Sequence, residues 1–382
     1  MSLRRSAGVL VVGALFLAGC GGSDGEPSST TSTAASSTDE TNGSKTTTTA
    51  GAAEAPIPEE PGPYAVGRRT EKVVDPERSD RTLTVEVWYP TDDAGDPTPY
   101  ELIAGVGFDS DLSTQDADPS AEGPFPLVVF SHGSGGLRQQ SASIVETVAS
   151  HGFVVVAPDH AGNTAIDQLV GTSTDPEVTA RNRVLDTRFM IDEVEAGDLA
   201  AGLADIDQVA VMGHSFGGFT ALAMAGGFDG IEADPRVDVI VPLAPASSRL
   251  DDDALASINI PMLIVTGTND ETTPIDDQST RPLELAGGPA TLVEIEGATH
   301  SGVTNICDIV DAVGAPDANL PDGALEAAQS QAGTMCDADA PIQAQEAFDI
   351  TEHYVVSFLR LYLYDDARYA DVAEIDGAVV RP

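Results

Sequence analysis

Six short, uninterrupted apolar segments between residues 127 and 295 constrain the fold of this chain more than any other feature. A strand with one wet face alternates apolar and polar residues, whereas runs that are apolar throughout are typical of strands buried on both faces of a parallel sheet. The six segments are 127–130, 153–157, 209–212, 237–243, 262–266 and 292–295. Helical patterns lie between or after them, at 139–150, 177–203, 216–225 and 348–363. This alternation predicts an α/β fold with a mostly parallel, doubly wound sheet and a ligand site at the carboxyl ends of its strands.

Two β-prone runs precede this pattern, at residues 69–74 and 82–89, with a polar connection between them. The second run alternates, because polar side chains separate Leu83, Val85 and Val87. We therefore expect an N-terminal antiparallel hairpin with one face closer to water.

The first 20 residues have the pattern of an export signal. Arg4 and Arg5 precede an uncharged apolar run over 7–18 that is too short to span a bilayer. The sequence Leu-Ala-Gly-Cys then ends at Cys20 and resembles a bacterial lipobox. It predicts a signal peptide over 1–19, a lipid on Cys20, and export to the outer face of the bacterial cell membrane, where the lipid anchors the protein. An ordinary secretion signal with a chance cysteine is the alternative.

A Ser/Thr-rich stretch over 28–50 contains no large apolar residue, so it cannot bury enough surface to offset the entropy of ordering. We interpret residues 20–62 as a flexible stalk. Residues 63–382 are enough for one large α/β domain, and we expect them to form it.

Cys307 and Cys336 are the cysteines that remain beyond the signal region. In an exported chain such an even pair predicts a disulfide, here inside an Ala/Asp-rich insert over 301–347. Two buried free thiols are the alternative. A metal site would need clustered His and Cys ligands, which the sequence lacks, so we expect neither a metal nor another cofactor.

The charge of the chain excludes nucleic-acid partners. Its 62 acidic residues outnumber 18 basic ones and give a formal net charge of −44, whereas phosphate contacts need clustered Lys and Arg. The acidity belongs on the surface of a soluble protein, which we expect to be a monomer. Within a screening distance of about 8 Å at physiological salt, it should also repel anionic substrates and lipids.

The motif with the most chemical content is Gly-His-Ser-Phe-Gly-Gly at residues 213–218, directly after a predicted strand and before a small-residue helix. A strand that turns sharply into a helix strains its pivot residue, and flanking glycines let the neighbouring backbone pass. The pattern therefore predicts that Ser215 is an exposed nucleophile at the N-terminus of a helix, whose dipole favours developing negative charge.

A serine needs a base to become a nucleophile, and the base needs a carboxylate to orient it. His300 lies in a loop just beyond the last predicted strand, whereas four of the six histidines precede Ser215 and His353 falls in the last helix. Asp270 follows the strand at 262–266, so it should lie beside the histidine loop. Three nearby carboxylates compete for this role but are explained more simply as a solvated rim: Asp276, Asp277 and Asp308.

A tetrahedral intermediate at the serine would need two backbone N–H donors. The first expected donor is the amide of Phe216, and the second is the amide of Ser134 in the Gly-rich turn after the first parallel strand, with Gly133 as the alternative. His132 in that turn is interpreted as a brace. His160 and Asn163, after the second parallel strand, are candidate substrate contacts, but loop bracing is the better explanation of both.

These residues resemble the α/β-hydrolase superfamily, with which they share the chain order Ser215, Asp270, His300. Within it, three segments resemble the platelet-activating-factor acetylhydrolase branch and its neighbours, the bacterial cutinases and polyester hydrolases, the dienelactone hydrolases and the chlorophyllases. The segments are LVVFSHGSGGLR at 127–138, ASHGFVVVAPDH at 149–160 and GHSFGG at 213–218. The resemblance covers about residues 64–300 and the last helix, and it implies an α/β-hydrolase fold.

Two departures limit what the resemblance implies. The acetylhydrolase branch carries its acid after the strand that corresponds to 237–243, where this chain has Ala244-Pro-Ala-Ser247, so the acid is displaced to Asp270 as in the cutinase-like group. The dienelactone hydrolases use a cysteine nucleophile, and Ser215 stands at that position here.

The sequence therefore predicts a lipid-anchored serine hydrolase that cleaves small-molecule or polymeric carboxylic esters through an acyl-enzyme intermediate. Two alternatives stay open: a peptidase on the same fold, and a surface lipoprotein that binds without catalysis. We also expect the disulfide to hold the histidine loop and to shape one wall of the substrate pocket.

Overall fold

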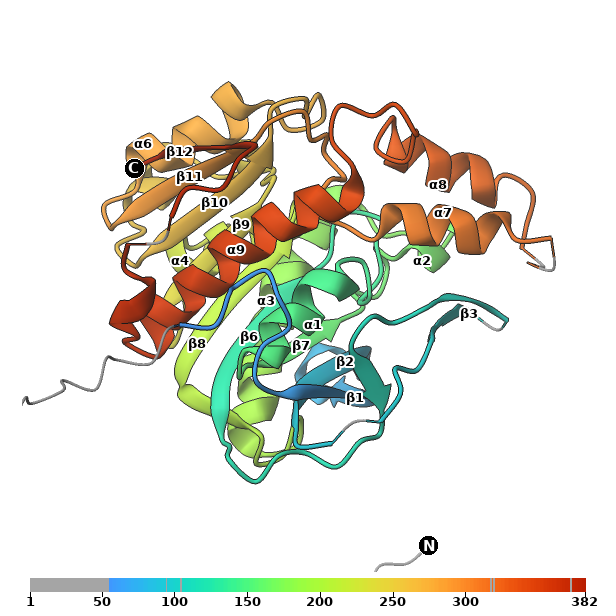
Figure 1. The fold of residues 1–382 in the computed structure, drawn as a ribbon, viewed down its shortest axis with the longest axis horizontal. Helices are drawn as coiled ribbons and strands as arrows, with labels where there is room; N and C mark the ends of the chain where they lie inside the picture. The colour runs from blue at the N-terminus through green and yellow to red at the C-terminus, as the bar shows by residue number, and fades with distance from the viewer. Residues whose placement is uncertain (1–54, 94, 104, 317, 319, 372) are drawn as a thin grey trace, which may run out of the picture. The chain divides into compact units, whose positions relative to one another are not determined.

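The computed structural model describes residues 55–382 apart from 94, 104, 317, 319 and 372 (Figure 1). The predicted signal peptide, Cys20 and the predicted stalk up to residue 54 lie outside the described residues.

A mixed sheet of ten strands runs through the described chain in the order β12-β11-β10-β9-β8-β6-β7-β2-β1-β5. Six neighbouring strands are parallel and overlap the six apolar segments of the sequence: β6 (Phe125–Ser131), β7 (Val154–Pro158), β8 (Ala204–His214), β9 (Val239–Leu243), β10 (Met262–Gly267) and β11 (Ala290–Ile295). The predicted hairpin is also present, since β1 (Ala65–Asp75) pairs antiparallel with β2 (Arg81–Thr91). The prediction of a mostly parallel α/β sheet is confirmed.

Helices cover both faces of the sheet, because each parallel strand is apolar on both faces. Helices α1 (Ala142–Ser150) and α9 (Ala344–Leu363) cover one face, and α3 (Pro176–Ala196) and α4 (Phe216–Gly226) cover the other (Figure 1). Successive residues of β6 alternate between the two cores: Val128 and Phe130 pack with the α1 and α9 side, whereas Leu127 and Val129 pack with the α3 and α4 side. Uninterrupted apolar runs are what such a doubly covered sheet requires.

The predicted helix over 177–203 is too long at its C-terminal end. Helix α3 ends at Ala196, and Gly197 follows with φ 79° and donates its N–H to Glu193 O and Val194 O. A glycine in this left-handed conformation is a common helix terminator. Residues after it turn towards β8, so the sequence pattern missed a stop signal that Gly197 itself carries.

The chain continues beyond α9. Two short strands at the edges of the sheet were not predicted: β5 (Ser113–Gln115), parallel to β1, and β12 (Ala378–Arg381), antiparallel to β11. Further short helices complete the described chain: η1 (Pro76–Arg78), η2 (Ser247–Arg249), α5 (Asp252–Ala256), η3 (Asp276–Thr280), α6 (Arg281–Leu285) and η4 (Ala367–Tyr369).

Three insertions gather beside the carboxyl ends of the parallel strands. The first is the two-stranded ribbon of β3 (Tyr100–Ile103) and β4 (Val106–Phe108), and the second is α2 (Ala165–Val170). The third is the predicted insert over 301–347, which contains α7 (Ile306–Gly314) and α8 (Ala324–Ala332), drawn in orange at the right of Figure 1. The disulfide predicted inside this insert is present between Cys307 and Cys336, with their Cα atoms 5.4 Å apart.

Residues just before 63, which the sequence assigned to the stalk, already contact the folded domain. The side chain of Glu59 lies 2.8 Å from His353 Nδ1, and Gly62 N donates to Ser150 Oγ at 2.8 Å. The domain contacts therefore begin several residues before the boundary that composition suggested. In the described part of the chain, no helix combines the length and the apolar character that crossing a membrane requires.

Candidate active site

Ser215 stands at the turn between β8 and α4, in the backbone conformation φ 57° and ψ −111°. This left-handed region is strained for a residue with a side chain. The neighbouring backbone allows the turn only because glycines flank it: a Cβ on Gly217 would lie 1.7 Å from Ser131 O, and one on Gly213 would lie 2.6 Å from the same oxygen. Ser215 is consequently fixed at the carboxyl end of β8 and only partly buried.

Ser215, His300 and Asp270 form a hydrogen-bonded row. His300 Nε2 lies 2.8 Å from Ser215 Oγ, and His300 Nδ1 lies 2.8 Å from Asp270 Oδ2. The histidine comes from the loop after β11 and the carboxylate from the loop after β10. The structure thus brings together the three side chains that the sequence singled out, at distances over which a proton can be shared.

The environment of Asp270 keeps its carboxylate ionised. Burial alone would raise its pKa, but hydrogen bonds from His300 and from Thr273 outweigh burial and lower the pKa of Asp270 below its usual value. Thr273 donates both its hydroxyl, at 2.6 Å, and its backbone N–H, at 2.7 Å. Of the competing carboxylates, Asp276 and Asp277 are exposed on η3, and Asp308 lies on α7, where it accepts from Asn305 at 2.8 Å.

The turn after β6 lies against the nucleophile elbow, as the close approach of Gly217 to Ser131 O shows. Within this turn the N–H of Gly133 already donates to Gln140 Oε1 at 2.6 Å, so it is not available to a ligand. In residues 55–382 as described, the backbone N–H groups of Ser134 and Phe216 have no protein acceptor. These two amides are therefore the pair that can face a developing oxyanion.

Arg183 of α3 supports the turn after β6 through hydrogen bonds, and the sequence analysis did not identify this residue. Its guanidinium is fully buried and donates to His132 O at 2.6 Å, to Gly133 O at 2.8 Å and to Asn163 Oδ1 at 2.9 Å. Burial lowers the pKa of Arg183 to about 9, so it stays charged near neutral pH. The available signal was the pair Arg183 and Asp186, two opposite charges three residues apart in a helix that also carries apolar residues.

The candidate substrate contacts His160 and Asn163 also belong to this support. His160 is 1% exposed, and it lies 2.9 Å from Ser131 Oγ and 3.0 Å from Asp186 Oδ2. Asn163 donates to Ser134 Oγ at 3.3 Å in addition to accepting from Arg183. Both side chains therefore brace the turn instead of lining a cavity.

The histidines around the turn are neutral. Burial lowers the pKa of His160 to about 4, and burial together with the charge of Arg183 lowers the pKa of His132 well below its usual value. His132 Nδ1 lies 2.7 Å from Gly133 O, and its Nε2 accepts from His160 N at 3.1 Å, which agrees with one neutral tautomer. His132 braces the turn, as its sequence position suggested.

His214 is a second residue that sequence reasoning left without a role. Its Nε2 lies 2.8 Å from the backbone oxygen of His300, and the two rings are 4.7 Å apart between centroids. Burial, followed by the nearby His300, lowers the pKa of His214 to about 3. The neutral ring must carry its proton on Nε2 to donate to that carbonyl, so it positions the loop that presents His300.

No cluster of three or more His, Cys, Asp or Glu side chains in the described residues could hold a metal ion. The chemistry that this arrangement supports is nucleophilic attack by a serine hydroxyl, with a histidine as base and two amides as oxyanion donors.

Parts of this chain are similar to known proteins in sequence and in fold. A family model described as Chlorophyllase matches residues 115–246. Cutinase 2 of Thermobifida cellulosilytica is 31% identical over 188 residues, which are 48% of this chain and 63% of that protein. Cutinase cut1 of Thermobifida fusca is 31% identical over 188 residues, which are 48% of this chain and 51% of that protein. Chlorophyllase type 0 of Chenopodium album is 28% identical over 139 residues, which are 35% of this chain and 38% of that protein.

The chain thus spans less than two thirds of the length of these relatives. A solved structure of a ferulic acid esterase from Streptomyces cinnamoneus superposes with a TM-score of 0.62 at 23% identity, covering 80% of this chain and 92% of that one. This likeness shows the fold, and the resemblance that the sequence motifs carry to cutinases and chlorophyllases is confirmed.

Proposed function

We propose that this chain, an α/β-hydrolase by fold and by similarity to the cutinases, hydrolyses carboxylic esters through an acyl-enzyme on Ser215. The observation that carries the proposal is the continuous row from Ser215 Oγ through the imidazole of His300 to Asp270, with both donor–acceptor distances at 2.8 Å. An isolated serine hydroxyl is a poor nucleophile, and this row supplies the base that activates it.

In the proposed first step, Ser215 Oγ attacks the ester carbonyl carbon while its proton passes to His300 Nε2. The carbonyl oxygen becomes an oxyanion that the amides of Phe216 and Ser134 stabilise. Collapse of the tetrahedral intermediate breaks the bond to the alcohol oxygen, which takes the proton from His300 Nε2 and leaves. In the second step, His300 removes a proton from water, the hydroxide adds to the acyl carbon, and the acid is released as Ser215 regains its proton.

The electrostatics of the site support this sequence of steps. Asp270 has a lowered pKa and stays ionised, so it stabilises the imidazolium that forms on His300. The amides of Phe216 and Ser134 are held before the reaction begins, because the elbow and the turn are fixed by close backbone packing and by Arg183. Losing one such donor typically costs about 10²–10³ in kcat.

The test uses an activated-serine probe and a short ester. Ser215→Ala should abolish both fluorophosphonate labelling and hydrolysis of p-nitrophenyl acetate, while circular dichroism shows an unchanged fold. Ser248→Ala is the matched control, because Ser248 is exposed on η2 next to the site but outside the row. Retention of substantial activity by Ser215→Ala would refute the assignment.

The same assay separates the remaining alternatives. A binding protein without catalysis would not react with the probe, since only an activated serine does. A peptidase would react with the probe and would also cleave peptide amides, which an esterase leaves intact. We expect ester cleavage to dominate.

We also propose that the protein acts as a monomer, tethered to the outer face of the bacterial membrane by lipid on Cys20. The support for this is the lipobox-like sequence ending at Cys20. Metabolic labelling with palmitate in a bacterial host should mark the wild type and fail to mark Cys20→Ser. Labelling of both proteins, or of neither, would contradict the anchor.

A further inference from the structure

A cavity of about 340 Å³ lies among the three insertions, outside the row of Ser215, His300 and Asp270. Its walls come from the β3–β4 ribbon, from α2, and from the insert helices α7 and α8. Helix α8 adds alanines and Gln331 to the lining, whereas the ribbon, α2 and α7 contribute large aliphatic side chains, among them Ile103, Val106, Ile166, Leu169, Ile309 and Val313. We call this cavity the chain pocket.

The chain pocket adjoins the catalytic loops through shared residues. Gly135 and Gly136 line it and directly follow Ser134, one of the proposed oxyanion donors. Gln140 lines it too, and its Oε1 holds the N–H of Gly133 at 2.6 Å. A group bound in the chain pocket would therefore touch the back of the turn that receives the ester carbonyl.

The histidine loop contacts a wall of the same cavity. Gln331 of α8 lines the chain pocket, and its backbone oxygen accepts from Ser301 Oγ at 2.7 Å. Ser301 directly follows His300. The chain pocket is thus lined by the turn that contains Ser134 and by a helix that is hydrogen-bonded to the histidine loop, so it lies next to the catalytic groups.

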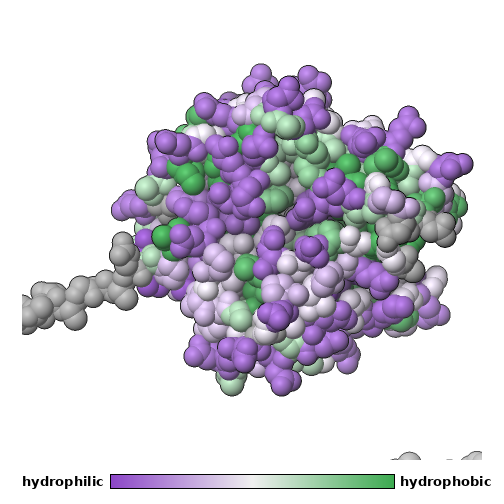
Figure 2. All heavy atoms as spheres, turned by 45° about the vertical axis from the view of Figure 1, so that its right-hand side comes forward, coloured by the Kyte–Doolittle hydropathy of each residue, from purple (hydrophilic) through white to green (hydrophobic). Residues whose placement is uncertain are grey.

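The lining is suited to a neutral aliphatic ligand. In a chain with a net charge of −44, Asp322 is the single charged residue among those that line the cavity in the described chain. Ile103 and Ile166 are 36% and 37% exposed and lie in one apolar lining, and contiguous apolar surface of this kind is typical of ligand-binding grooves. In Figure 2, with the insert side turned forward, hydrophobic residues gather at the right of the view.

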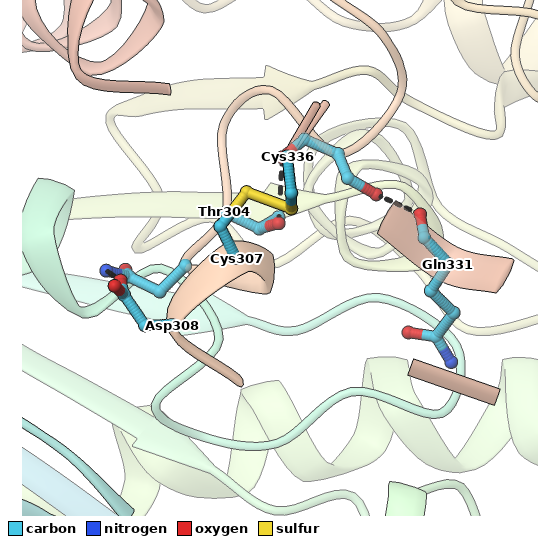
Figure 3. The surroundings of a disulfide bond; sticks show 7 residues. Thr304, Cys307, Asp308, Gln331 and Cys336 are labelled. Carbon is cyan, nitrogen blue, oxygen red and sulfur yellow. Dashed lines mark hydrogen bonds between the residues drawn. A yellow bond between two sulfur atoms is a disulfide. The ribbon is translucent and has the colours of Figure 1, made fainter. Parts of the chain in front are cut away.

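The disulfide fixes the insert wall of the cavity. Cys307 is the second residue of α7, and Cys336 follows α8, so the covalent bond closes the helical pair on itself. Figure 3 shows the bond close to Thr304 of the histidine loop and to Gln331. The two helices of the wall are therefore held against each other.

We propose that the chain pocket binds a linear aliphatic chain of the ester, so that the enzyme prefers lipid-like esters with extended chains over acetates. This inference rests on the proposed ester hydrolysis at Ser215 and adds its substrate class. The bound aliphatic group could belong to the acid or to the alcohol of the ester, and two series of substrates distinguish these possibilities.

The first experiment measures kcat/KM for p-nitrophenyl esters from acetate to decanoate, below their micellar concentrations. Each methylene buried in an apolar pocket contributes about fourfold, so kcat/KM should rise steadily until the pocket is full. Ala327→Trp fills the cavity from α8, where Ala327 is exposed and lines it. This variant should lose the rise and keep wild-type acetate hydrolysis. Ser330→Trp, on the same helix but outside the lining, should behave as wild type.

The second series uses n-alkyl acetates, in which only the alcohol chain grows. A rise in one series that Ala327→Trp abolishes supports the proposal and identifies which chain is bound. The absence of a rise in both series, or a rise that persists in Ala327→Trp, overturns it. Ile166→Gln, which makes an exposed wall position polar, provides a second variant that should reduce the rise.

A binding experiment that needs no catalysis tests this inference separately from the proposed function. Ser215→Ala should bind the neutral dye N-phenyl-1-naphthylamine, and 1-decanol should displace it, whether or not the protein is an esterase. Adding Ala327→Trp should weaken dye binding at least tenfold, and unchanged binding would overturn the proposal. Analytical ultracentrifugation of the wild type and of Ala327→Trp supplies the last check. A wild-type dimer that Ala327→Trp dissociates would show that the cavity is an interface between two copies of the protein, and this result would overturn the proposal.

Discussion

Ser131 Oγ lies 2.9 Å from His160 Nε2, and His160 Nδ1 lies 3.0 Å from Asp186, so the molecule contains a second Ser-His-Asp row. Its spacing nearly repeats that of Ser215 and His300, at 2.8 Å. The two rows differ in access, because Ser131 and Asp186 have no exposed surface and His160 has 1%. Hydrogen-bond geometry alone therefore does not identify the nucleophile, whereas the strained, partly exposed position of Ser215 does.

This comparison predicts where an activated-serine probe reacts. Fluorophosphonate should modify Ser215 alone, and peptide mass spectrometry should find Ser131 unmodified. Ser131→Ala should retain labelling and keep acetate hydrolysis within about tenfold, because only one of several supports of the turn is lost. Labelled Ser131 in the folded protein would contradict the distinction between the two rows.

The fold was largely predictable because its signals are local. Runs such as 127–130 and 209–212 are short and continuously apolar, and only strands covered on both faces favour that pattern. The order of Ser215, Asp270 and His300 along the chain followed from the same map, since each comes after a strand end. Long-range register was not needed for either prediction.

The residues that the sequence did not reveal act across long separations. Arg183 and Gly133 are 50 residues apart in the chain, and no local pattern links a helix residue to a turn carbonyl. The edge strand β12 was missed for the same reason, because its four residues gain stability only by pairing with β11. The sequence predicted the insert as one wall of a pocket, but the three insertions are far apart in the chain, so the cavity that they share appears only in the folded protein.

The contacts of Arg183 predict a kinetic effect. Arg183→Lys keeps the charge but cannot donate simultaneously to His132 O, Gly133 O and Asn163, so the Ser134 amide should lose its alignment. We expect kcat to fall by about 10² with KM little changed, as when an oxyanion donor is lost. Steady-state kinetics on p-nitrophenyl acetate measure this split.

The same substitution should destabilise the protein by about 3 kcal/mol, because buried carbonyl groups lose their donors. Arg181→Lys is the control on the same helix, since its side chain is exposed and pairs with Asp229 at 3.0 Å. That pair should contribute less than about 1 kcal/mol. Urea unfolding measures both variants, and an unchanged kcat in folded Arg183→Lys would argue against the positioning role.

The contact between His214 and the backbone of His300 predicts a second positioning effect. His214→Ala removes the donor to that carbonyl, and a shift of the histidine loop by about 1 Å can cost about 10² in rate. His214→Gln should restore part of kcat, because its side-chain amide can donate to the same oxygen. Equal rates for the Ala and Gln variants would show that the hydrogen bond has no role.

The buried His160 predicts that stability falls in mild acid. Its pKa is about 4 in the folded protein against 6.5 for the ordinary group, so below pH 6.5 the unfolded chain binds a proton that the folded chain does not. Its contribution is therefore fully present above pH 6.5 and is lost as the pH falls towards 4. Between pH 6.5 and 5 this amounts to about 2 kcal/mol.

The measurement compares urea unfolding of the wild type and of His160→Gln at both pH values. Because glutamine does not titrate, the variant should lose about 2 kcal/mol less than the wild type over this interval. The comparison cancels the contributions of the other buried histidines, which both proteins share. Parallel losses in the two proteins would show that His160 does not supply this pH dependence.

The disulfide predicts different effects on stability and on two substrates. Closing a loop of 29 residues stabilises a folded chain by about 3–4 kcal/mol in the chain-entropy model. Cys307→Ser with Cys336→Ser, in a Cys20→Ser background, should lose roughly that amount.

Because Ser215, His300 and Asp270 lie outside the closed loop, acetate hydrolysis should change little. Hydrolysis of decanoate should fall more, because α7 and α8 form one wall of the chain pocket. Equal losses of activity on both esters would mean that the disulfide supports the histidine loop and not the chain pocket. Unchanged stability and unchanged rates would mean that the disulfide constrains neither the histidine loop nor the chain pocket.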